Sequence, residues 1–265
     1  MSIRKKNIFI SASSEKERIK FLKAIANLAF ANIEQTKLYL IDPEYSHKEW
    51  QIDSNNRDCT VYAEYEPQPR FNGIKDDSIL DALCLLKDCV EDRAKGVIKA
   101  KRLGKNSSDR LSALWIINNA ELLAKKYPYT PSSRENNAVK PIIYMLKLGH
   151  LVEDMMIVSG KSPCLQEYGI SRADFMNFDV AIWLGEDNIQ KGINEVSNNI
   201  LSRIKQLREE LKTLTEQNLT DEYIALVKIR GEEPFITTMS FSCISLDFSK
   251  IYEQKKEKYL SPILG

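Results

Sequence analysis

The chain has 265 residues, 43% of them hydrophobic and 28% charged, and its formal net charge is only +1. This length allows one large domain or two small ones, and the near-neutral charge excludes a global attraction to nucleic acid or to an anionic membrane. The sequence has no apolar run of the roughly 18 residues that a membrane helix needs, and its five cysteines are scattered without a C-x-x-C pair. We therefore expect a cytoplasmic protein with reduced thiols and no membrane span.

The first expected elements form a strand–helix–strand unit. The apolar segment NIFISA at residues 7–12 predicts a strand, and Ser14 with Glu17 has the pattern of a capping box that begins a helix. This helix is expected from about residue 15 to 33 because apolar residues recur along one face of it. The segment KLYLID at residues 37–42 predicts the second strand. This order and length are typical of a parallel βαβ unit.

The middle of the chain has mainly helical periodicity. Residues 60–66 alternate between apolar and polar side chains, which indicates a half-exposed strand. Apolar residues then recur at helical spacing over residues 79–97, and further helices are expected at 108–127 and 139–156. We therefore expect residues 75–158 to form a helical insertion.

The β pattern returns in the last third of the chain. DVAIWLG at residues 179–185 predicts a strand, and a long helix is expected at 188–217. Residues 222–229 and 235–248 are expected to form a C-terminal β-hairpin around a Gly–Pro turn. The predicted fold class is therefore α/β, with a βαβ start, a central helical insertion and a C-terminal hairpin. The expected parts are an N-terminal α/β part, the insertion, and a C-terminal α/β part that completes the same domain: residues 1–74, 75–158 and 159–265.

One segment contains half of a Walker-type phosphate-binding loop, whose full pattern G-x-x-x-x-G-K-[ST] lies between a strand and a helix. Residues 155–164 read MMIVSGKSPC, with the GKS ending at 160–162. Met155 stands at the first glycine position, and Pro163 removes a backbone donor where the phosphate would bind. The MMIV residues also fit the end of the preceding helix. We interpret this segment as an ordinary loop, with Gly160 ending that helix.

FISASSEKERIKFLKAIANLAFANIEQTKLYLIDPE, residues 9–44, resembles the opening of the ParA/MinD group of deviant-Walker ATPases. The shared pattern is an apolar strand, a loop, an Ala-rich helix and a strand ending in Ile-Asp. In that group the glycines and paired lysines would lie between Ser11 and Lys20, where this chain has no glycine. The resemblance therefore implies a degenerate P-loop fold that does not hydrolyse ATP, and no cofactor is assigned. A TIR-like or deoxyribosyltransferase-like opening would share the same pattern.

Acidic residues at strand ends leave an enzymatic alternative open. Glu64 and Glu66 lie on one face of the alternating strand, Asp58 precedes it, and Asp42 and Glu44 end the earlier strand. Carboxylates at strand ends can hold divalent ions for phosphodiester or nucleotide processing, although they also fit a solvated strand face. The chain has only two histidines and no G-x-S-x-G motif. No catalytic residue and no metal ligand is therefore assigned.

A basic segment within residues 93–110 is the candidate nucleic-acid-binding surface. Lys95, Lys99 and Arg102 share one helical face opposite the apolar stripe, which suits contacts to phosphates. No aromatic residues are interleaved, so base stacking is not expected here, and a solvated helix face has the same pattern. The candidate residues are Lys95, Lys99, Lys101, Arg102 and Lys105.

A heptad pattern in the expected helix 188–217 is the candidate partner-binding surface. The apolar positions are Ile193, Ile200, Leu207 and Leu214, with Ile204 and Leu211 in the second seam position. Thirty residues of helix would be about 45 Å long, so one end is expected to protrude and contact a protein partner or a second copy of the chain. A helix lying along its own sheet is the alternative. The expected function is a non-enzymatic binding or assembly component on a nucleotide-binding-like fold.

Overall fold

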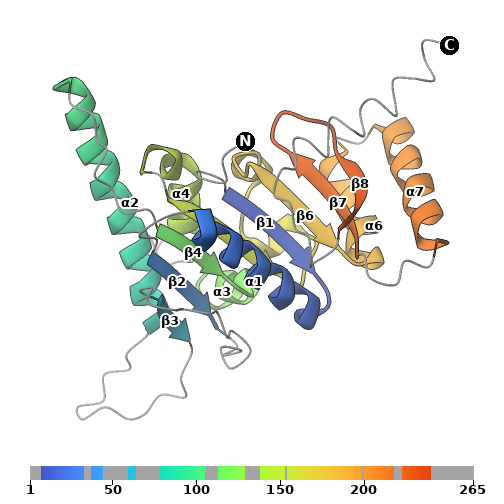
Figure 1. Ribbon diagram of the computed structural model, residues 1–265, viewed down its shortest axis with the longest axis horizontal. Helices are drawn as coiled ribbons and strands as arrows, with labels where there is room; N and C mark the ends of the chain where they lie inside the picture. Colours follow the sequence, from blue (N-terminus) through green and yellow to red (C-terminus); the bar gives the residue numbers. More distant parts are fainter. Residues whose placement is uncertain are drawn as a thin grey trace.

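The structure is a computed structural model. It describes residues 7–32, 37–43, 59–63, 78–104, 113–128, 138–152, 154–197, 200–217 and 223–239. Within these ranges the chain forms one eight-stranded sheet in the order β3-β2-β4-β5-β1-β6-β7-β8 (Figure 1). The strands are β1 (Asn7–Ala12), β2 (Lys37–Asp42), β3 (Cys59–Ala63), β4 (Ala113–Ile117), β5 (Met155–Gly160), β6 (Val180–Leu184), β7 (Tyr223–Ile229) and β8 (Phe235–Met239).

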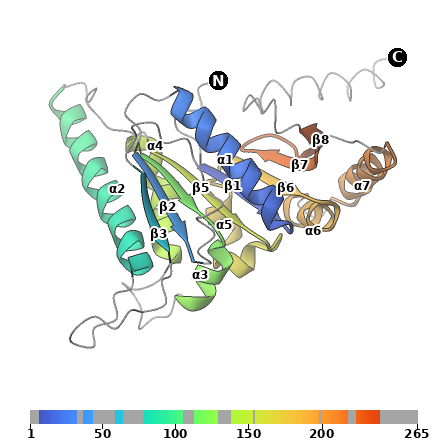
Figure 2. The same cartoon turned by 60° about the horizontal axis from the view of Figure 1, so that its bottom comes forward.

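Helices cover both faces of this sheet. They are α1 (Glu15–Asn32), α2 (Ser78–Arg102), α3 (Ala120–Lys126), α4 (Val139–Val152), α5 (Arg172–Phe175), α6 (Glu186–Val196) and α7 (Leu201–Thr215), with a short 3₁₀ helix η2 (Leu165–Tyr168). One face of the sheet packs against α1 through Ile19, Leu22 and Ile25. The opposite face packs against α2, α3, α4, α6 and α7. Figure 2 shows α1 on the side of the strands opposite α3.

The predicted α/β class is confirmed, as are its βαβ start and its C-terminal hairpin. The six neighbouring strands β3, β2, β4, β5, β1 and β6 are parallel, whereas β7 pairs antiparallel with both β6 and β8. The capping residue is also confirmed, because the Glu17 backbone N–H donates to Ser14 Oγ at 3.4 Å at the start of α1. The hairpin is described as far as Met239, and the rest of the expected strand lies outside the described residues.

The helix predicted at residues 108–127 is wrong in its first half. Residues Ala113–Ile117 are strand β4, and helix α3 begins only at Ala120. β4 lies between β2 and β5, and all five of its side chains are buried. A strand covered on both faces has a continuous apolar run rather than alternation, so its pattern cannot be distinguished from that of a buried helix.

The same effect explains a second error, in residues 139–156. Helix α4 ends at Val152, and MMIVSG at Met155–Gly160 is the fully buried strand β5. Gly160 therefore ends a strand and not a helix, so the interpretation of Gly160 as a helix stop is wrong. The insertion predicted at 75–158 is consequently helical only in part, since it contributes β4 and β5 to the middle of the sheet.

The single long helix predicted at residues 188–217 is wrong as well. It is divided into α6 and α7 near Ser197, which interrupts the heptad pattern in the sequence. The Ser197 N–H donates to the Ile193 carbonyl at 3.1 Å, and the Ile200 N–H donates to the Ser197 carbonyl at 3.0 Å. This turn lets α7 pack against β7 and β8. In the described part of the chain, no helix is both long enough and apolar enough to span a membrane.

Candidate functional site

The sheet topology identifies one edge as the place for a site. Strand β1 lies between β5 and β6, and the chain leaves β1 through α1 to reach β2 on the β5 side of the sheet. Connections that leave neighbouring strands in opposite directions open a crevice at the carboxyl ends of those strands, where ligands of α/β proteins bind. Helix α1 also begins directly after β1, so its N-terminus faces this edge.

Arg18, from the first turns of α1, extends into this edge. Arg18 is fully buried, with 0% of its surface exposed, which is unusual for an arginine. Its Nε donates to Asn118 Oδ1 at 3.0 Å, and its Nη2 donates to Asn119 Oδ1 at 2.5 Å. Its Nη1 donates to the backbone carbonyl of Ala12 at 3.2 Å. The guanidinium therefore joins the end of β1 to the residues that follow β4.

The two asparagines are held rigidly after β4. The Asn118 N–H donates to the Ile41 carbonyl at 2.9 Å, and Ser159 Oγ of β5 donates to Asn118 Oδ1 at 3.0 Å. Asn119 has φ 51°, in the left-handed region that non-glycine residues rarely adopt. Such a conformation at the edge of a sheet marks a position that the surrounding structure enforces. Asn118 Nδ2 is buried without a hydrogen-bond partner among the described residues.

The GKS loop after β5 presents backbone carbonyls to β1. Ser11 Oγ donates to the Ser162 carbonyl at 2.8 Å, and Tyr168 Oη donates to the same carbonyl at 2.7 Å. The Asn188 side-chain amide donates to Ser11 Oγ at 2.8 Å and to the Lys161 carbonyl at 3.1 Å. A phosphate needs N–H groups pointing toward it. These carbonyls have the opposite polarity, so this loop does not have the geometry of a phosphate cradle.

The Glu121 side chain accepts a hydrogen bond from a backbone amide of this loop. The Lys161 N–H donates to Glu121 Oε1 at 2.6 Å. Burial raises the pKa of the Glu121 carboxyl, and the Lys161 N–H and the Arg18 charge oppose this shift. Strand end and helix approach closely here, since a Cβ on Gly160 would lie 1.9 Å from Glu121 Oε2. A carboxylate thus occupies the position of an anion at this loop.

The predicted nucleic-acid residues lie far from this edge, on α2. Lys95, Lys99, Lys101 and Arg102 are all exposed, and Lys105 lies outside the described residues. Their role as a binding surface stays a prediction. Of the acidic strand-end residues, only Asp42 is described, and it is fully buried. In the described ranges, no three His, Cys, Asp or Glu side chains come together as a metal site requires.

The predicted partner-binding residues are divided between core and surface. Ile193, Leu207 and Leu211 are buried in the chain's own core, and Ile204 and Leu214 pack against that core. Ile200 is 51% exposed, and its neighbour Leu201 is 81% exposed. Most of the heptad seam is therefore satisfied within the chain, which is the arrangement of a helix along its own sheet. A partner contact stays a prediction and would use the exposed residues at the start of α7.

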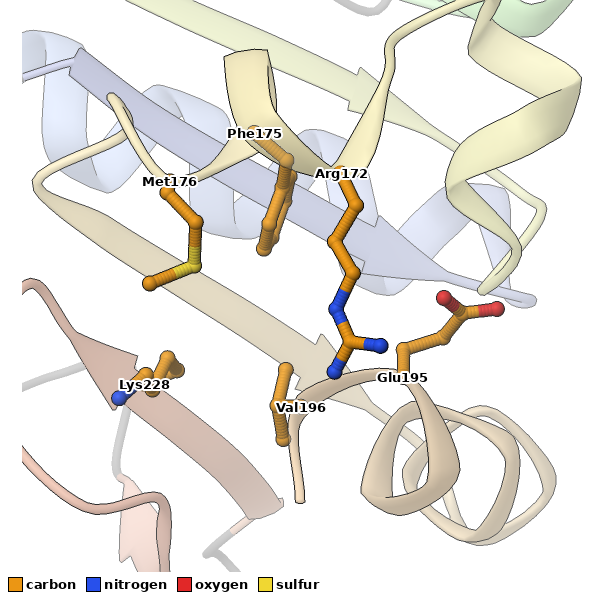
Figure 3. A pocket seen from close by; sticks show the side chains of 6 residues that line it. All are labelled: Arg172, Phe175, Met176, Glu195, Val196 and Lys228. Carbon is orange, nitrogen blue, oxygen red and sulfur yellow. The ribbon is translucent and has the colours of Figure 1, made fainter. Parts of the chain in front are cut away.

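A small cavity lies between α5, α6 and β7 (Figure 3). Its volume is about 20 Å³, enough for about one water molecule. Burial lowers the pKa of Lys228, whose Nζ donates to the Glu232 carbonyl. Lys228 pairs with Ala181 near the start of β6, at the edge opposite Arg18. This cavity is too small for a substrate.

Sequence reasoning missed Arg18, Asn118, Asn119 and Glu121. A signal for Arg18 existed, because it lies four residues before Leu22 and seven before Ile25, both on the buried face of α1. A basic residue on an apolar helix face indicates a buried polar partner. The asparagines could not be found, since the strand that positions them was predicted to be a helix.

No protein-family model and no curated protein sequence matches the chain. Solved structures match its fold. The pCW3 conjugation coupling protein TcpA, in its monomer form with ATPγS, is 14% identical with a TM-score of 0.56, covering 91% of this chain and 62% of that one. EssC (ATPases 2 and 3) of Geobacillus thermodenitrificans is 12% identical with a TM-score of 0.55, covering 97% and 44%.

The cytoplasmic domain of the type VII secretion ATPase EccC of Thermomonospora curvata is 12% identical with a TM-score of 0.52, covering 88% of this chain and 25% of that one. The chain thus spans less than two thirds of each of these proteins. At such identities the similarity concerns the fold alone. The similarity supports a nucleotide-binding-like α/β fold and is consistent with the P-loop fold that the N-terminal resemblance implies. The narrower ParA/MinD resemblance stays a prediction.

Proposed function

We propose that this chain is a non-enzymatic binding or assembly component of a larger cytoplasmic complex. It uses a P-loop NTPase-like fold whose phosphate position is closed by the chain's own Arg18. The observation that carries the proposal is the fully buried guanidinium at the carboxyl edge of β1 and β4, bonded to Asn118, Asn119 and the Ala12 carbonyl.

The chemistry of the edge supports closure in two ways. Arg18 donates to three oxygen atoms of the chain itself at the carboxyl edge of the sheet, so these donors are not free to bind a phosphate. The Glu121 carboxyl group accepts the Lys161 N–H, so this donor of the GKS loop is not free to bind a phosphate. The Ser11–Lys20 segment adds no glycine through which a backbone could wrap around an anion.

The assembly role rests on the exposed start of α7. Ile200 and Leu201 are large apolar side chains with 51% and 81% of their surface exposed, next to each other at the N-terminus of the helix. Adjacent exposed apolar residues of this kind suit contact with a protein partner or a second copy. The similar structures carry names from conjugation and secretion, which supports a role within a larger assembly.

Phosphate release from ATP tests the non-enzymatic part of the proposal. The chain is expected to release no phosphate above the buffer rate, with or without Mg²⁺. Turnover that Lys161→Ala or Lys20→Ala abolishes would overturn the proposal, because it would assign a catalytic lysine to an edge of the sheet that we consider closed. Co-purification from the native host tests the assembly part of the proposal and would identify the partner.

A further inference from the structure

The charges of α2 are segregated along its length. From Ser78 to Asp92 the helix has four acidic residues and one lysine. From Arg93 to Arg102 it has no acidic residue and five basic ones: Arg93, Lys95, Lys99, Lys101 and Arg102. A solvated helix that is stabilised by its own i,i+4 pairs would mix the two signs. The second part of α2 is therefore a local basic region in a chain with a net charge of only +1.

This basic region extends beyond the core. Val90, Ala94 and Val97 form the buried stripe of α2. Lys101 is the next position in that stripe, four residues after Val97, and it is exposed. The helix has therefore left the core by this point, and Figure 1 shows its end projecting past the sheet. A projecting helix of 10–12 Å in diameter has the size that enters the major groove of B-DNA, about 12 Å wide.

Three cations of this projecting end have no ion-pair partner in the part of the chain that the structure describes. Arg93 is paired with Asp154, and Lys95 with Glu91 and Asp92. By contrast, no acidic group among the described residues pairs with the remaining three, which we call the basic tip: Lys99, Lys101 and Arg102. One cation in the last turn is enough to complement the helix dipole, so that explanation does not account for three.

The positions of the three cations around the helix axis favour one kind of partner. At 100° per residue, Lys99 and Lys101 lie about 200° apart around the helix, whereas Arg102 is near Lys99. A flat anionic membrane would contact only one of these sides. A helix end that lies between the two phosphate backbones of a groove could contact both backbones with cations on its two sides. Ile98 (42% exposed) and Leu103 (63% exposed) flank the cations and add apolar contact surface.

We propose that the basic tip of α2 binds the phosphate backbone of double-stranded nucleic acid with little sequence preference. The tip is separate from the Arg18 edge, so this binding does not depend on whether that edge is closed. Three phosphate contacts predict a weak interaction whose log–log salt slope is about −3.

Fluorescence anisotropy of labelled DNA duplexes of two unrelated sequences, measured from low to physiological salt, tests this proposal. The wild-type chain is expected to bind both duplexes alike. Lys99→Glu with Lys101→Glu should lower the affinity at least tenfold and reduce the salt slope to about −1. The uncharged pair Lys99→Gln with Lys101→Gln should have a smaller effect of the same kind. The matched control is Lys16→Glu with Lys20→Glu, which changes the charge equally at exposed positions of α1 and should retain binding.

Circular dichroism melting tests whether each variant is folded. If the Glu pair weakens the helix, the Gln pair, which is expected to leave the helix intact, still tests the proposal. Equal losses in the tip and control variants would overturn the proposal, since net charge alone would then explain binding. Failure of the wild-type chain to bind either duplex at low salt would also overturn it. Binding to anionic phosphatidylserine vesicles but not to DNA would assign the tip to a membrane surface instead.

Discussion

Arg18 Nε and Asn118 Oδ1 meet at 3.0 Å, although the two residues are 100 positions apart in the sequence. The bond joins helix α1 to the residues that follow β4, at the carboxyl edge of the sheet. Arg18 completes the contact with Asn119 and Ala12. We infer that this contact replaces, within the chain, the bridge that a bound phosphate and cation would make between the same elements.

The first prediction concerns the stability that Arg18 provides. Arg18→Met removes three hydrogen bonds from a charged donor and leaves Asn118 Oδ1 with only its bond from Ser159, so the free energy of unfolding should fall by about 3 kcal/mol. Arg18→Lys should lower the free energy of unfolding by less, because a lysine keeps the charge. It should still lower it, since a lysine cannot reach all three acceptors. Urea denaturation measures the effect. The control Lys20→Met, exposed on the same helix, should change stability by less than about 0.5 kcal/mol. Equal effects at both positions would contradict a structural role for Arg18.

The second prediction concerns the close contact at Gly160. Gly160→Ala would place Cβ 1.9 Å from Glu121 Oε2 and 2.5 Å from Tyr168 Oη, so these two side chains or the end of β5 must shift. We expect a loss of about 2 kcal/mol in unfolding free energy. Gly149→Ala in α4 is the comparison, because its Cβ would meet only the flexible Met145 side chain. That variant should be near neutral, since alanine favours a helix. A neutral Gly160→Ala would show that Glu121 does not hold the loop in this position.

The third prediction concerns pH and the buried Asp154. Arg93 lies 2.7 Å from both carboxylate oxygens, yet burial raises the Asp154 pKa from 3.8 to about 6, outweighing the attraction of Arg93. The folded state therefore holds this proton more tightly than the unfolded chain. The resulting stability is full below about pH 4 and is lost as the pH rises through about 6, with a slope of at most about 1.4 kcal/mol per pH unit.

Asp154→Asn removes the titrating group and should remove this slope. Denaturation of both proteins at several pH values between 4 and 7 gives the difference, in which contributions from other groups cancel. Asp174 is one of these, because its hydrogen bond from Ser171 and its contact with Lys147 lower its pKa and give a slope of the opposite sign. Parallel pH curves for the two proteins would show that Asp154 does not titrate in this range.

The fourth prediction separates the two roles of α7. Leu207 is 0% exposed and lies in the core, so Leu207→Asp should unfold the chain, by burying an unpaired charge. Leu201 is 81% exposed, so Leu201→Asp should leave the melting temperature nearly unchanged. It should nevertheless reduce self-association or co-purification of a partner. Size-exclusion chromatography with light scattering and pull-down experiments make the comparison. A folded Leu201→Asp variant with undiminished association would remove α7 from the account.

Sequence patterns predicted strands β1, β2 and β6 and the C-terminal hairpin, but not strands β4 and β5. The segment at residues 7–12 was recognisable as a strand because it is a short apolar run, and the capping Ser14 two residues later separates it from the next helix. β4 and β5 are short, buried on both faces and adjacent to helices, so their apolar runs extended the neighbouring helical patterns. Tertiary position and not local preference makes these segments strands.

The candidate site depended on that same error. Asn118 and Asn119 are brought to Arg18 only by the position of β4 in the sheet, over a separation of about one hundred residues. The heptad pattern failed for a different reason. Apolar residues at seven-residue spacing satisfy an intramolecular groove as well as a partner helix, and the polar Ser197 was the position at which the helix is interrupted.

Thermal unfolding in the presence of Mg²⁺ and ATPγS tests the closed phosphate position most directly. A ligand at one hundred times its dissociation constant stabilises the folded state by about 2.7 kcal/mol, a rise in melting temperature of roughly 5–10 °C for a chain of this size. Our account predicts no rise for the wild-type chain up to millimolar nucleotide. A saturable rise in melting temperature at those concentrations would show that the edge accepts phosphate despite Arg18, and it would contradict the account.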